Sequence, residues 1–316
     1  MNAFSAKSLN LRVRKEIMKI LLQFPEGLKK LAFEEAGRLE KEGHEVFVSS
    51  AECFGACDLA LEEAKAVGAK KIIHWGHSDF GVKSRIPVEY REYPIQIDAE
   101  KISAMVLPKL SKFKKIGLLT TVQHVGQLDE LRQELERAGK TVLVGKGVRT
   151  RYPGQVLGCD FGAAKSIEAK VDCFVYFGGG LFHALADVGK PLLRADPFSG
   201  KVGWMDEELA KARSRRKGAM NALAVAKKVG ILVSTKIGQK NTRGALVIKK
   251  ELEEVGKICL LLVANKLEFN GLANFGSFDC FVNTACPRIS DDTELAGKPV
   301  INLQDARVVA RMLVKK

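Results

Sequence analysis

The chain has 316 residues, of which 46% are hydrophobic and 28% charged, an ordinary globular composition for about two or three domains. No stretch approaches the ~20 apolar residues of a membrane-spanning helix, and the apolar run near the N-terminus is too short for a signal-peptide core. The net charge of +14 favours an acidic partner or only a lysine-rich surface, because the lysines are spread along the chain.

Three segments of the chain begin in the same way, with lysine followed by an apolar run. These runs are KILLQFPEG from Lys19, KKIGLLTTVQHVGQ from Lys114 and KKVGILVSTKIGQK from Lys227. The second and third are followed by LDELRQELERAGK and GALVIKKELEEVGK, whose apolar spacing predicts helices that end at a glycine. Each segment therefore begins with a predicted strand, loop and helix.

Three more apolar runs follow in each segment, and each predicts a strand. The second runs are HEVFVSS, KTVLVGK and KICLLLVAN, the third are KKIIHWGHS, CFVYFGGGLFH and CFVNTACPR, and the fourth begin at Pro87, Pro191 and Pro299. We therefore predict an α/β fold of three homologous small domains, each a four-stranded parallel sheet flanked by helices, around a central cleft. The expected domains are residues 1–106, 107–208 and 209–316.

The seven cysteines fall into two groups by their surroundings. Without an export signal they indicate a reducing cytoplasm and metal-binding, catalytic or buried thiols rather than disulfides. Those in apolar strands are expected to be small buried hydrophobes, and Cys53 is expected to be a loop thiol. Those among small residues and turn formers, in FGACD, LGCDF and TACPR, are Cys57, Cys159 and Cys286.

These three cysteines follow predicted strands, one in each domain. Ligands of open parallel sheets bind beyond the carboxyl ends of the strands, so the three thiolates are expected to meet at the central cleft. Three soft ligands suit zinc or an iron–sulfur cluster. Structural zinc usually takes four protein ligands from short paired spacings, which are absent here, whereas a cubane cluster on three thiolates leaves one iron open for substrate.

Other candidates surround the same predicted strand ends. The glycines of YFGGGLFHALA can cradle an anion, so Gly178, Gly179, Gly180 and His183 are candidate cofactor contacts, with a plain tight turn as the alternative. Matching loops after the first strands offer further polar contacts to a small ligand, although helix capping explains threonines equally well. These further candidates are Thr120, Gln123, Lys236 and Gln239.

Two other motifs are expected to have no metal-binding role. His74 and His77 fall on opposite faces if their strand continues, which argues against a two-histidine metal site. The acidic SDD segment, residues 290–292, is expected to begin a helix rather than to bind magnesium, and Pro287 to end the preceding strand.

Taken in order, FGACDLA, YPGQVLGCDF and FVNTACPRISDD resemble the archaeal diphthamide synthases, the 2-(3-amino-3-carboxypropyl)histidine synthase family, over almost the whole chain. The segments GGGLFHAL and STKIGQK are also similar to that family. Phe54 stands where the family more often has tyrosine, and Cys53 is an extra thiol.

The resemblance implies a 4Fe–4S cluster on Cys57, Cys159 and Cys286 and S-adenosylmethionine as co-substrate. It also implies a radical transfer of the 3-amino-3-carboxypropyl group to the imidazole C2 of a histidine on translation elongation factor 2. A homodimer and an external electron donor are expected, with no membrane and no direct nucleic-acid partner. The alternatives are a three-domain nucleotide- or RNA-binding protein with structural cysteines and a zinc-stapled scaffold without catalysis.

Overall fold

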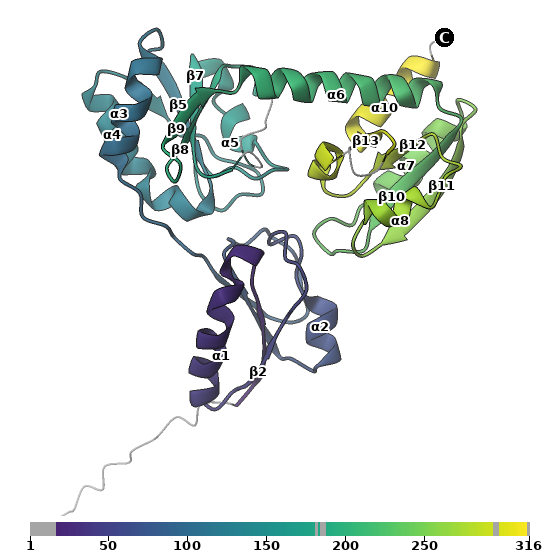
Figure 1. The fold of residues 1–316 in the computed structure, drawn as a ribbon, viewed down its shortest axis with the longest axis horizontal. Helices are drawn as coiled ribbons and strands as arrows, with labels where there is room; N and C mark the ends of the chain where they lie inside the picture. Colours follow the sequence, from purple (N-terminus) through teal and green to yellow (C-terminus); the bar gives the residue numbers. More distant parts are fainter. Residues whose placement is uncertain (1–16, 181–182, 184–187, 293–296, 315–316) are drawn as a thin grey trace, which may run out of the picture.

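The computed structural model describes residues 17–180, 183, 188–292 and 297–314. Three sheets follow one another along the chain and surround a common centre in Figure 1. Their strand orders are β2-β1-β3-β4, β6-β5-β7-β8-β9 and β11-β10-β12-β13. We call the parts of the chain around these sheets the first, second and third units. The predicted α/β fold of three units, each with a parallel sheet, is confirmed.

The first unit has four parallel strands, which the apolar runs predicted. They are β1 (Lys19–Gln23), β2 (Glu45–Val48), β3 (Lys71–Trp75) and β4 (Val88–Arg91). The 3₁₀ helix η1 (Glu26–Leu31) and α1 (Ala32–Lys41) pack on one side, where Leu22 and Ile73 are buried against Leu39. Helix α2 (Leu61–Ala66) adds Ala64 to a second buried cluster with Leu21 and Ile72.

The second unit has one strand more than expected. Its parallel strands are β5 (Lys115–Thr120), β6 (Thr141–Leu143), β7 (Cys173–Phe177) and β8 (Leu192–Asp196), and β9 (Lys201–Trp204) pairs antiparallel with β8. The hairpin turns at Gly200, whose φ of +67° is one that glycine adopts without strain. Its helices are α3 (Ala99–Val106), η2 (Leu107–Leu110), η3 (Val122–Gln127), α4 (Leu128–Arg137), α5 (Gly162–Lys165) and η4 (Glu168–Lys170).

The third unit repeats the pattern of the first. Its parallel strands are β10 (Lys228–Ser234), β11 (Ile258–Ala264), β12 (Cys280–Asn283) and β13 (Val300–Asn302). Helices α7 (Thr242–Glu253) and α10 (Leu303–Val314) share one buried cluster with the sheet, and the remaining elements are α8 (Phe269–Ala273) and η5 (Pro287–Asp292). The SDD segment thus ends a 3₁₀ helix that begins at Pro287, so its expected place at a helix start was wrong.

A single long helix, α6 (Asp206–Val225), connects the second and third units, as Figure 1 shows. Leu209 near its start is buried in the second unit, and Leu223 near its end is buried in the third. Helix α3 packs in the core of the second unit, although its residues fall inside the expected first domain. The domain limits at 106/107 and 208/209 stay a prediction. No helix in the described ranges combines the length and apolar character needed to span a membrane.

Candidate functional site: three thiols at one cavity

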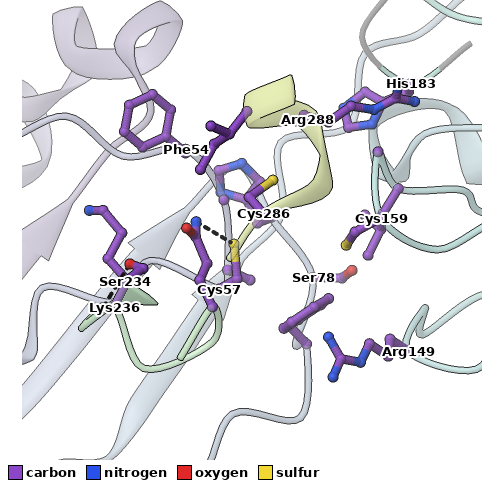
Figure 2. A pocket seen from close by; sticks show the side chains of 18 of the residues that line it. Phe54, Cys57, Ser78, Arg149, Cys159, His183, Ser234, Lys236, Cys286 and Arg288 are labelled. Atoms are coloured by element: carbon purple, nitrogen blue, oxygen red, sulfur yellow. Dashed lines mark hydrogen bonds between the residues drawn. The ribbon is translucent and has the colours of Figure 1, made fainter. Parts of the chain in front are cut away.

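Three loops from three sheets bring Cys57, Cys159 and Cys286 to one cavity of about 240 Å³ (Figure 2). The same three residues line an adjoining cavity of about 310 Å³. Cys57 follows β2, Cys159 follows β6 and Cys286 follows β12, so each thiol lies beyond the carboxyl end of a parallel strand. All seven cysteines are free thiols, and those of the apolar strands, Cys173, Cys259 and Cys280, are buried in the cores.

The three sulfur atoms are too far apart for one metal ion. Among the described residues, only Cys53, His74 and His77 form a group of three donor atoms that all lie within 4.8 Å of one another. At least one pair of the three sulfur atoms is therefore more than 4.8 Å apart. A single zinc ion with Zn–S bonds of about 2.3 Å brings its thiolates within about 4.6 Å of each other. A cluster of several metal ions spans a wider set of thiolates, so the spacing favours the cluster over the zinc-stapled scaffold.

Burial keeps Cys57 and Cys159 protonated without a metal. It raises the pKa of Cys159 to about 11, and the neighbouring Cys286 and Cys57 add to the increase. Burial also raises the pKa of Cys57, opposed by the Gln239 amide, which donates a hydrogen bond to Cys57 Sγ at 3.5 Å. Because ligands must be thiolates, a metal group here has to displace these protons.

Short contacts hold the cysteine loops in place. The Gly238 N–H donates to the Cys57 carbonyl at 3.0 Å, which joins the third unit to the first. The Asn283 amide donates to the Cys286 carbonyl at 2.7 Å. Next to Cys159, the Asp160 carboxylate accepts hydrogen bonds from the N–H groups of residues 148, 149 and 162. Each thiol therefore stands on a loop fixed by hydrogen bonds.

Cations and aromatic rings form much of the cavity wall. Lys236 forms an ion pair with Asp58, and its ammonium lies 5.6 Å from the centre of the Phe54 ring. The guanidinium of Arg149 lies 5.0 Å from the centre of the Phe80 ring, and Arg288 also lines the cavity. A cavity with these groups suits a ligand that carries a carboxylate.

The predicted cofactor contacts divide into those that line this cavity and those that do not. Lys236, Gln239 and His183 line it. Thr120 is fully buried and donates to the Phe177 carbonyl at 2.6 Å, and Gln123 donates to the Gly76 carbonyl at 3.0 Å. The glycines at 178–180 are also not among its lining residues, and part of the stretch from Tyr176 to Ala186 lies outside the described residues.

Arg149, Arg288 and Phe80 line the cavity but were not predicted from the sequence. Arg288 follows Cys286 by two residues, which was a usable signal once that cysteine was chosen. Arg149 lies in the loop that leads toward Cys159, in a chain with 51 lysines and arginines, so nothing in its local sequence distinguished it.

The expectation that His74 and His77 point apart was wrong. Strand β3 ends at Trp75, and Gly76 turns the chain with φ +79°. His77 is thereby brought back onto His74, and His74 Nε2 lies 3.0 Å from His77 Nδ1.

Comparisons with known proteins agree with this geometry. A family model described as "Putative diphthamide synthesis protein" matches residues 24–315. The 2-(3-amino-3-carboxypropyl)histidine synthase of Pyrococcus horikoshii is 35% identical over 298 residues, which cover 92% of this chain and 85% of that protein. Subunit 1 of the synthase from Gibberella zeae is 28% identical over 304 residues, which cover 92% of this chain but only 64% of that protein.

A solved structure has the same fold as this chain. The crystal structure of Dph2 from Pyrococcus horikoshii with a 4Fe-4S cluster is similar with a TM-score of 0.85 at 33% identity, covering 93% of this chain and 86% of that chain. The family match, the identity and the shared fold extend over nearly the whole chain. This chain therefore belongs to the diphthamide synthesis protein family.

Proposed function

We propose that this chain is a 2-(3-amino-3-carboxypropyl)histidine synthase, a transferase that catalyses the first step of diphthamide synthesis. It would move the 3-amino-3-carboxypropyl group of S-adenosylmethionine to the imidazole C2 of a histidine on elongation factor 2. The observation that carries the proposal is the meeting of three thiols from three units at one cavity.

The residues present fit a 4Fe–4S cluster held by Cys57, Cys159 and Cys286. Their sulfur atoms are spaced too widely for one ion, and three thiolates leave one iron without a protein ligand. When bound, the cluster supplies the electron that cleaves the sulfonium bond to the methionine γ-carbon, which releases the 3-amino-3-carboxypropyl radical and methylthioadenosine. An external donor has to provide that electron.

The protein's own contribution is to bind and orient the co-substrate and to exclude water. Arg149 and Arg288 line the cavity and would hold the carboxylate of the methionine part, and Phe54 and Phe80 provide flat apolar surfaces on its wall. The Lys236–Asp58 ion pair and the Gln239 amide fix the loop of Cys57. The sequence also predicts Lys236, Gln239 and His183 as co-substrate contacts. They keep that role in this proposal.

The protein substrate would approach along an open groove of about 840 Å³ next to the cavity. Arg149 and Phe80 belong to both, so the groove leads toward the three thiols. Lys83, Arg151 and Lys240 make it basic, which suits an acidic surface around the target histidine.

We further propose a cytoplasmic homodimer. The free state of all seven thiols supports a reducing compartment. Strand β11 is an edge strand that pairs only with β10 in the described residues, and its Ile258 and Leu260 are 65% and 53% exposed. Unpaired apolar edges are surfaces that a second chain can cover.

The direct test is an anaerobic reaction of the reconstituted protein with dithionite, S-adenosylmethionine and elongation factor 2. The proposal predicts methylthioadenosine together with a mass increase of the factor equal to one aminocarboxypropyl group. Cleavage of S-adenosylmethionine without transfer would contradict the assigned protein substrate, and a colourless, iron-free protein after reconstitution would contradict the cluster.

A further inference from the structure

A second group of metal-binding side chains lies beside the cavity. The donor atoms of Cys53, His74 and His77 all lie within 4.8 Å of one another. Cys53 is 6% exposed and His74 is fully buried. One thiol and two imidazoles within this distance match the ligand types and spacing of a site for one ion, unlike the wider set of three cysteines.

The hydrogen bonds of Gln23 determine which ring nitrogen of His74 can bind a metal ion. The Gln23 side-chain amide donates to the Asp58 carbonyl at 2.7 Å, and its side-chain oxygen accepts from the Ala60 N–H at 3.1 Å. The same oxygen lies 2.9 Å from His74 Nδ1. Because that oxygen is an acceptor, Nδ1 carries the hydrogen and donates it.

His74 therefore presents the lone pair of Nε2 toward His77 Nδ1, in a group whose donor atoms lie within 4.8 Å of one another. A metal-binding histidine almost always donates its other N–H to an oxygen that fixes the ring, and Gln23 supplies that oxygen here. Burial lowers the pKa of His74 to about 3 and that of His77 to about 4, so both rings are neutral near pH 7. His77 also lines the cavity, so the group has one side open to it.

We propose that Cys53, His74 and His77 bind one Zn²⁺ ion, with a fourth position open toward the cavity. Zinc takes thiolate and imidazole ligands together, which the hard ions magnesium and calcium do not. On binding, the Cys53 thiol releases its proton to solvent. If His77 binds through Nδ1, the hydrogen that now bridges it to His74 Nε2 moves to His77 Nε2, so the ring stays neutral.

The ion would have a structural effect on the proposed cluster site. Cys53 precedes Cys57 by four residues in the loop after β2, whereas His74 lies in β3 and His77 in the turn that follows it. An ion among them would tie the loop of Cys57 to the sheet of the first unit. The inference does not depend on the proposed function, because it rests on a separate group of ligands.

The test uses Co²⁺ as a spectroscopic probe and Zn²⁺ as its competitor, in the full chain with Cys57→Ser, Cys159→Ser and Cys286→Ser combined. This background removes the cluster thiols, which would also bind these ions. We expect about one Co²⁺ per chain, with the visible bands of a tetrahedral site and a thiolate charge-transfer band, both displaced by Zn²⁺. Adding Cys53→Ser should abolish the charge-transfer band, and the matched control Cys259→Ser should keep it.

A second measurement covers the case in which the triple variant does not fold. The wild-type chain is reconstituted with its cluster, and zinc and iron are quantified together. The site is supported if the wild-type chain holds about one zinc ion. That zinc should be lost in Cys53→Ser and in His77→Gln while the iron content stays unchanged, and it should be kept in Cys259→Ser. Zinc below stoichiometry in the wild-type chain, or zinc content insensitive to Cys53→Ser, would overturn it and leave a histidine pair joined only by a hydrogen bond.

Discussion

Lys236 and Asp58 join the third unit to the first, directly beside Cys57. Their side chains are 11% and 7% exposed, so the pair is largely removed from solvent. A buried charge that loses its partner is costly, whereas loss of both charges together costs much less. The pair therefore stabilises the contact mainly by preventing an unpaired buried charge.

Replacing Lys236 by methionine should lower the free energy of unfolding by about 3 kcal/mol, because the Asp58 carboxylate is left unpaired. Asp58→Asn in the same chain should restore part of that loss. Urea unfolding of the two single variants and the double variant measures the coupling. Strictly additive effects would show that the ion pair contributes nothing to this contact.

The loop after β10 approaches the loop of Cys57 closely at Gly238. A Cβ atom at this position would lie 2.4 Å from the Cα atom of Cys57 and 2.6 Å from its carbonyl oxygen. Backbone atoms cannot move aside as a flexible side chain can, so only glycine fits while both loops keep their places. The local structure of one unit thus depends on another unit's loop.

Gly238→Ala should therefore separate the two loops and reduce iron incorporation severalfold, with little effect on the helices. Gly218→Ala is the matched control, because Gly218 lies inside α6 with no atom within 4 Å of its added Cβ. That control should bind iron normally and gain up to about 1 kcal/mol of stability. Normal iron content in Gly238→Ala would refute the role given to this contact.

Helix α1 is tied to strand β4 by the carboxylate of Glu35. Arg38 donates to it at 2.8 and 3.0 Å, and Arg91 forms a second ion pair with it. The hydrogen bonds from Arg38 are the main reason why the pKa of Glu35 lies below its ordinary value, and the charge of Arg91 adds to the effect, while burial opposes it.

A lowered carboxyl pKa gives stability that is present above the unfolded-state pKa and lost as pH falls through the folded-state value. Glu35→Gln should lower the free energy of unfolding at pH 7 by about 1 to 2 kcal/mol, because two arginines lose an anionic partner. The difference from the wild-type chain should begin to shrink below about pH 4, near the unfolded-state pKa, and disappear as pH falls through the lower folded-state pKa. A difference that stays constant from pH 7 to pH 3 would exclude the carboxylate charge as its cause.

On the scale of the whole molecule, the exposed edge strand β11 predicts how two chains meet. Leu260→Lys places a charge in the centre of that edge, and charged residues on an edge prevent pairing with another chain. Light scattering after gel filtration should show a dimer for the wild-type chain and a monomer for Leu260→Lys. Val148→Lys is the control, because Val148 is 87% exposed and lines the basic groove instead of the β11 edge. A dimer in both variants would place the interface elsewhere.

Features read from local patterns were predicted well. Apolar runs located twelve of the thirteen described strands, and small residues around Cys57, Cys159 and Cys286 distinguished them from buried thiols. Strand β9 was missed because four residues with an internal glycine carry almost no alternation. The turn at Gly76 was missed because positive φ cannot be recognised from a glycine alone.

Features that depend on contacts between units could not be predicted from one sequence. The pairing of Lys236 with Asp58, and the approach of Gly238 to Cys57, join residues about 180 positions apart. The cavity roles of Arg149 and Arg288 depend on where their loops meet, which the local sequence does not contain.

Iron and sulfide analysis after anaerobic reconstitution of single cysteine variants tests most directly whether one thiol from each unit holds the cluster. We predict about four iron and four sulfide per wild-type chain, with the cluster lost in Cys57→Ala, Cys159→Ala and Cys286→Ala. Cys173→Ala and Cys259→Ala, which change thiols of the buried strands, should keep it. A full cluster in any of the first three variants, or its loss only in the last two, would show that the cluster is not held by one thiol from each unit.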